Sequence, residues 1–145
     1  MASELREVLG DLAATAFIES NPLFRLLPPE ERHDLLELAR LVDFSAGEIA
    51  SAESDENFLL VIEGSGSVQL ESVEVGHLGR GATFGEGRVL GTGRPLSLLA
   101  ATDLRVVTFP TPMIAALAER HPKLKKLLEV VQAARERETA ARGPA

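Results

Sequence analysis

The sequence predicts a single α+β domain in which a mainly β barrel or sandwich lies between two helical segments. Apolar residues at three- and four-residue spacing are confined to the two ends of the chain, whereas the middle has short apolar runs separated by glycines. Strands grouped between helices favour α+β over an alternating α/β sheet. The chain has 145 residues, 45% of them hydrophobic, which is enough for one core, so residues 1–145 are expected to form one domain.

The N-terminal segment, about residues 4–42, is expected to be helical. Apolar residues recur at helical spacing over residues 4–19, and Pro22 ends that pattern. A second helix is expected to begin near Pro29, because proline and acidic residues favour a first helical turn. Its apolar face continues to Val42.

The middle segment, about residues 43–110, is expected to be β. Apolar runs at residues 58–62, 96–101 and 104–109 are strand candidates bounded by glycine or polar turns. Residues 67–75 alternate between apolar and polar side chains with one slip in phase. Such a slip indicates a bulge or a tight turn.

The C-terminal segment, about residues 112–138, is expected to return to helix. Pro112 can open one helix, and Pro122 ends or bends it. The last helix carries an apolar stripe, interpreted as core packing with a dimer seam as the alternative: Leu124, Leu127, Leu128, Val131 and Ala134. Residues 139–145 are expected to fray.

The composition excludes or disfavours several classes of function. The absence of cysteine excludes disulfides, thiolate catalysis and cysteine metal sites, and the three histidines lack paired metal spacing. A net charge of −7 disfavours nucleic acid and anionic membrane surfaces as partners. No signal peptide, membrane span or nucleophile elbow is recognisable, so we expect a cytoplasmic protein that is not an enzyme.

The segment that carries chemistry is the glycine-rich stretch at residues 79–101. Glycines let backbone N–H groups approach an anion, and a helical turn starting near Glu86 would aim its N–H groups at the same point. Arg94 offers planar donors suited to phosphate oxygens. A carboxylate such as Glu86 is costly beside a phosphate unless hydroxyls donate to it, as a ribose would. The stretch therefore predicts a sugar-phosphate site, with a surface ion pair between Glu86 and Arg94 as the alternative.

This stretch resembles the phosphate-binding cassette of cyclic-nucleotide-binding domains, the family found in catabolite activator protein, protein kinase A regulatory subunits and gated channels. The resemblance covers about residues 26–128. Its segments in chain order are FSAGEI (44–49), FLLVIEG (58–64), HLGRGATFGE (77–86), RPLSLLA (94–100) and ATDLRVVTFP (101–110). It implies a jelly-roll barrel of about eight short antiparallel strands with flanking helices.

The resemblance also implies which residues bind the ligand. Glu86 would accept a hydrogen bond from the ribose 2′-hydroxyl, and Arg94 would bind the cyclic phosphate. Backbone N–H groups from Gly85 to Gly87 would complete the anion site. Ser97 would contact the phosphate or the base.

The predicted function is a regulatory sensor for cAMP or cGMP, with no other cofactor. Ligand binding would shift the last helix, which would pass the change to a protein partner or to a second copy of the chain. The segment from Glu86 to Arg94 is one residue shorter than the family pattern, and Pro95 follows Arg94. This departure motivates an alternative, a ligand-free member of the fold that serves as a docking or assembly module.

Two further expectations concern Arg88 and DNA binding. Arg88 is expected to be a solvated cation, with replacement of Arg94 as the phosphate ligand as the alternative. A DNA-binding regulator related to catabolite activator protein is disfavoured, because the chain is acidic and no helix-turn-helix follows the last helix.

Overall fold

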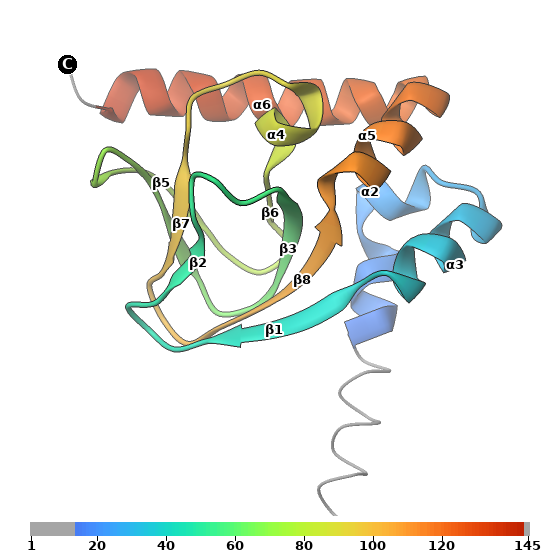
Figure 1. Ribbon diagram of the computed structural model, residues 1–145, viewed down its shortest axis with the longest axis horizontal. Helices are drawn as coiled ribbons and strands as arrows, with labels where there is room; N and C mark the ends of the chain where they lie inside the picture. Colours follow the sequence, from blue (N-terminus) through green and yellow to red (C-terminus); the bar gives the residue numbers. More distant parts are fainter. Residues whose placement is uncertain (1–13, 144–145) are drawn as a thin grey trace, which may run out of the picture.

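The computed structural model describes residues 14–143, in which helices flank a β-rich centre (Figure 1). Residues 14–20 are helical, and the earlier part of the expected first helix lies outside the described residues. The other helices are α2 (Pro22–Arg25), α3 (Pro29–Glu37), α4 (Glu86–Leu90), α5 (Thr111–Arg120) and α6 (Pro122–Arg142). The strands are β1 (Arg40–Phe44), β2 (Ile49–Ser51), β3 (Asn57–Glu63), β4 (Gly66–Leu70), β5 (Val73–Leu78), β6 (Thr83–Phe84), β7 (Ser97–Ala100) and β8 (Leu104–Pro110).

The described strands form two antiparallel four-stranded sheets, ordered β1-β8-β3-β6 and β2-β7-β4-β5. The first strand pairs with the last, the second with the seventh, the third with the sixth and the fourth with the fifth. The chain is therefore a long hairpin rolled into two sheets, which is a double-sheet jelly roll. The predicted fold class is confirmed, with the refinement that the strand pairing leaves two sheets and does not close a barrel.

Strand β3 is buried on both faces, which explains the unbroken apolar run in its sequence. Leu59 and Val61 point into the core between the two sheets. Phe58, Leu60 and Ile62 point to a second core, formed with the helices. A strand covered on both faces is expected to read as continuous apolar residues rather than as an alternation.

The predicted second helix ends earlier than expected. The helix α3 stops at Glu37, and Arg40–Phe44 forms strand β1 along the edge of β8. Val42, assigned by the sequence to a helical face, pairs with Val106 and packs against the core between the sheets. The expectation of helix up to residue 42 is wrong, because pairing with β8 overrides a short stretch of helical spacing.

The phase slip at residues 67–75 is a tight turn, as predicted. Glu71 and Ser72 have positive φ angles of 52° and 68°, and they connect β4 to β5. A register shift between Val68 and Gln69 adds an irregularity to the same hairpin. Two consecutive left-handed residues are what a two-residue hairpin turn requires.

The last helix, α6, lies across the β-rich part of the molecule and over α4 and β5 (Figure 1). Its inward side is apolar at Leu124 and Leu128 and polar farther on, at Gln132 and Thr139. Thr139 is buried and α6 continues to Arg142, so the expectation of fraying from residue 139 is wrong. No helix within residues 14–143 is long and apolar enough to cross a membrane.

Candidate ligand-binding site

A cavity of about 340 Å³ lies between the glycine-rich cassette and α6, and we call it the cassette cavity. The cassette residues that line it include Gly85, Glu86, Gly87, Arg88 and Arg94, and α6 contributes Gln132 and Arg135. Ser97, at the start of β7, is not part of this lining. The structure thus brings five of the six predicted site residues to one cavity, and their binding of a ligand stays a prediction.

The cassette contains the predicted helical turn, bounded by glycines in left-handed conformations. Gly85 precedes α4 with a φ of 107°, and Gly91 follows it with a φ of 71°. A Cβ at Gly85 would lie 3.0 Å from the carbonyl oxygen of Asn57. Both the backbone angle and this close approach favour glycine at that position. Gly85 connects β6 to α4, and the side chain of Glu86, the first residue of α4, points toward α6.

Glu86 is completely buried and forms an ion pair with Arg135 of α6. The Arg135 Nη1 lies 2.6 Å from Oε1 and 2.9 Å from Oε2 of Glu86, and Nη2 donates to the Thr83 carbonyl at 2.9 Å. The Thr83 hydroxyl lies 3.4 Å from Oε2. The alternative of a surface ion pair between Glu86 and Arg94 is therefore wrong, because the carboxylate is buried and paired elsewhere.

Arg88 points inward and binds backbone groups, so the expectation of a solvated cation is wrong. Its Nη1 and Nη2 donate four hydrogen bonds, to the Ser51 hydroxyl at 2.7 Å and to the carbonyl oxygens of Ala52, Asn57 and Leu96 at 2.8, 3.2 and 3.2 Å. Burial lowers the pKa of Arg88, while the carboxylates of Asp55 and Glu86 act to raise it. With four acceptors already in place, this guanidinium fixes the loops around the cassette.

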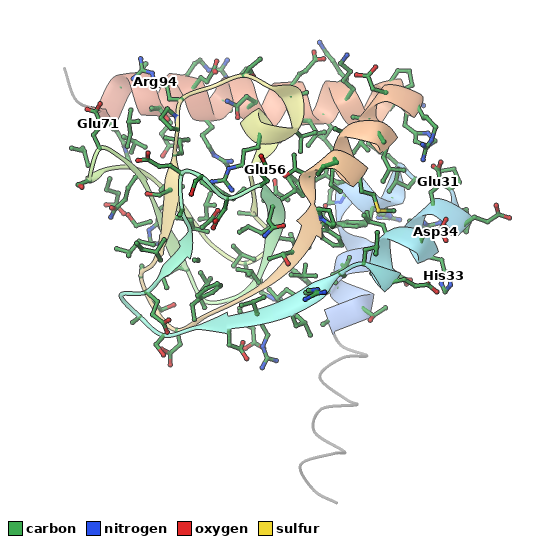
Figure 2. All side chains as sticks on the ribbon, viewed as in Figure 1. Glu31, His33, Asp34, Glu56, Glu71 and Arg94 are labelled. Carbon is green, nitrogen blue, oxygen red and sulfur yellow. The ribbon has the colours of Figure 1, made fainter. Side chains whose placement is uncertain are left out.

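Arg94 is exposed and has no hydrogen-bond or ion-pair partner among residues 14–143. Figure 2 places it beside the C-terminal half of α6. Besides the cassette cavity it lines a second cavity of about 320 Å³, together with Glu136 and Thr139. The Thr139 hydroxyl is buried there without a hydrogen-bond partner. Arg94 is thus the arginine of the cassette whose donors remain available to an anion.

The fold of this chain matches the folds of solved protein structures. No protein-family profile matches the sequence. The cAMP-bound PfPKA-R structure superposes with a TM-score of 0.72 at 16% identity, over 90% of this chain and 46% of that one. The sensor domain of the transcriptional regulator DNR from Pseudomonas aeruginosa gives 0.71 at 16% identity, over 90% of this chain and 99% of that domain. The chain has the cyclic-nucleotide-binding fold.

Another structure with the cyclic-nucleotide-binding fold comes from a protein that is described as cAMP-independent. The regulatory subunit of a cAMP-independent protein kinase A from Trypanosoma brucei matches with a TM-score of 0.64 at 18% identity, over 77% of this chain and 44% of that one. This chain spans less than half the length of the PfPKA-R chain and of the Trypanosoma brucei chain. The likeness therefore establishes the architecture, while the ligand has to be argued from this chain's own cavity.

The sequence analysis did not predict two residues of the site, Gln132 and Arg135. Gln132 is buried between two cassette glycines, where a Cβ at Gly87 or Gly93 would lie 3.0 or 2.4 Å from its Nε2. The sequence does hold one signal for them. Gln132 and Arg135 continue, at four- and three-residue steps, the face that begins with the buried Leu128.

Among residues 14–143, no group of three or more histidine, aspartate or glutamate side chains could hold a metal ion. The cassette cavity is lined by guanidinium and amide groups and also by two acidic residues, Glu53 and Glu86. The guanidinium groups suit an organic anion.

Proposed function

We propose that this chain is a cytoplasmic regulatory sensor module that binds a cyclic purine nucleotide, cAMP or cGMP, in the cassette cavity and that catalyses no reaction. One observation carries the proposal: the cavity that the cassette lines is also lined by Gln132 and Arg135 of α6. A ligand there would contact both the cassette and the helix. The volume of about 340 Å³ is within the range of small-molecule sites. The cAMP-bound structure with this fold supports the ligand class, and the DNR sensor domain supports the sensor role.

Signal transmission would pass through α6. A ligand can bias the position of this helix only by the difference in its affinity for the two positions. Gln132 and Arg135 are the α6 residues that would sense the ligand, because they line the cavity. On the same helix the exposed Val130, with 53% of its surface accessible, is available to a protein partner or to a second copy of the chain.

The Glu86–Arg135 ion pair supports a second candidate function, a ligand-free docking module. The ion pair already neutralises the buried carboxylate, and Arg94 lies at the surface. Under this alternative, α6 would remain closed on the cassette and the domain would act through its surface alone. The two candidates make opposite predictions for nucleotide binding.

Isothermal titration of the chain with cAMP and with cGMP tests the proposal. We expect saturable binding of at least one nucleotide, and a loss of about tenfold or more in affinity for Arg94→Gln, because hydrogen bonds to charged groups contribute about 1.5–3 kcal/mol. Arg137→Gln is the matched control, since Arg137 is exposed on α6 and lines none of the cavities described above. Absence of heat with both nucleotides at millimolar concentration would overturn the sensor proposal and leave the docking module as the candidate function.

A further inference from the structure

The Glu86 carboxylate is already paired with this chain's own groups. Both of its oxygens accept hydrogen bonds from Arg135, and the Thr83 hydroxyl lies within reach of one of them. No part of the Glu86 side chain is exposed. A sugar hydroxyl could reach this carboxylate only after Arg135 had moved away.

Arg135 is held too firmly to be an incidental partner of Glu86. Its side chain is only 13% exposed, and its second terminal nitrogen donates to the Thr83 carbonyl. Its guanidinium also lies 5.7 Å from the centre of the Phe84 ring. Removing Arg135 from this place would leave the buried Glu86 charge without compensation, which is strongly unfavourable.

Anion recognition is not blocked in the same way. Arg94 lines both the cassette cavity and the second cavity, and among the described residues its guanidinium donates to no protein acceptor. An anionic group can therefore be bound without breaking an existing contact. Arginine is well suited to this, because its planar donors match the oxygens of a phosphate.

From these contacts we infer that Arg135 sets the ligand specificity of the cassette cavity: it withdraws Glu86 from the ligand, so that the site recognises the ligand's anionic group and not a ribose 2′-hydroxyl. The inference rests on the proposed function and departs from the role that the resemblance implies for Glu86. The ligand class is accordingly a cyclic nucleotide regardless of its sugar, ribose or deoxyribose. Arg135 is a specificity-determining residue because it is the group that competes for the carboxylate.

The test compares cAMP with 2′-deoxy-cAMP by isothermal titration on the wild-type chain, so that the first result needs no substitution. We expect the two dissociation constants to agree within about threefold. In Arg135→Met the cation is lost, and we expect the flexible methionine to let a sugar hydroxyl donate to Glu86 in place of the guanidinium. There we expect cAMP to bind about tenfold or more tighter than the deoxy form, the usual effect of a hydrogen bond to a charged acceptor. Arg137→Met is the matched control and should retain the wild-type ratio.

Three results of these titrations would contradict the inference. A tenfold preference of the wild type for cAMP, abolished by Glu86→Gln, would show that Glu86 contacts the sugar. Binding of cAMP by Arg135→Met but not by the wild type would show that Arg135 blocks the site altogether. Should Arg135→Met fail to fold, Glu86→Gln decides, because we expect it to leave the ratio of the two affinities unchanged. Binding of neither nucleotide by any variant would overturn the proposed function itself and the inference with it.

Discussion

The three arginines around the cassette cavity differ in what their guanidinium groups contact. Arg88 donates to four backbone and hydroxyl oxygens, Arg135 pairs with a buried carboxylate, and Arg94 faces solvent. A guanidinium carries five donors and stays charged, so its burial requires that acceptors surround it. The acceptors around Arg88 and Arg135 are supplied by the protein, which makes these two residues part of the framework.

Loss of Arg88 should therefore destabilise the fold. In Arg88→Met the carbonyl oxygens of Ala52 and Leu96 lose their charged donor. We expect the free energy of unfolding to fall by about 2–3 kcal/mol, because the stranded acceptors are partly shielded from water. Urea denaturation measures this change.

Arg137→Met is the control for Arg88→Met. The same change at this exposed position of α6 should stay within about 0.5 kcal/mol of the wild type. Equal stabilities of the two variants would mean that the hydrogen bonds of Arg88 contribute nothing beyond those it makes with water.

At the scale of elements, α4 and α6 are joined by a close contact that depends on Gly87. A Cβ at this position would lie 2.5 Å from the Thr92 carbonyl oxygen and 3.0 Å from the Gln132 Nε2. Alanine would favour the helical conformation of α4 by about 1 kcal/mol. A backbone oxygen at 2.5 Å cannot move away without distorting the turn after α4, so the steric cost should outweigh that gain.

Gly87→Ala is accordingly expected to lower the free energy of unfolding by about 1–2 kcal/mol, despite the better helix propensity of alanine. Thermal denaturation followed by circular dichroism measures it. Gly79→Ala is the matched control, since a Cβ there would meet nothing within 4 Å and the backbone is not left-handed. The control should be neutral or slightly stabilising. A stabilised Gly87→Ala would contradict the close contact of α4 with the turn that follows it.

The elements that the sequence predicted best are those whose signal is local. The apolar run in β3 and the phase slip before β5 depend on neighbouring residues alone, and both were found. Strand β1 was missed because its formation depends on β8, some 60 residues away along the chain. Three or four apolar residues at the end of a helix have no period long enough to separate the two structures.

In the candidate site, too, the residues that are close together in the sequence were predicted and a distant partner was not. The glycines and charges of the cassette are contiguous in the sequence, and the structure places five of the six predicted residues around one cavity. The partner of Glu86 lies 49 positions away, on a different helix. The spacing from Leu128 places Arg135 near the inward face of α6 but does not identify it as the partner of Glu86. The predicted stripe ended with Val131 and Ala134, whereas the face turned inward carries Gln132 and Thr139.

At the scale of the whole molecule, one charged cluster connects the N-terminal helices to the start of α6. Glu31 of α3 is paired with Arg120, at the end of α5, and with His121, at the junction between α5 and α6. Figure 2 labels Glu31 on the side of the molecule where α3 and this junction lie. Because the direction of α6 is set at this junction, the cluster helps to fix the helix that covers the cassette cavity.

Acid should weaken this connection. Desolvation opposes ionisation of Glu31, but the hydrogen bonds and charges of His121 and Arg120 outweigh it and hold the pKa of Glu31 below its ordinary value of 4.5. A carboxyl whose pKa is lower in the folded state contributes stability above its unfolded pKa and loses it as the pH falls toward the folded value. The melting temperature of the wild type should therefore fall more steeply below about pH 4.5 than that of Glu31→Gln, which has no such carboxyl to protonate.

Melting curves between pH 3 and pH 7 test this, with Glu30→Gln as the control because Glu30 is an exposed acid in the same turn of α3. We expect the control to follow the wild-type pH dependence, and superimposable curves for the wild type and Glu31→Gln would show that Glu31 does not stabilise the junction.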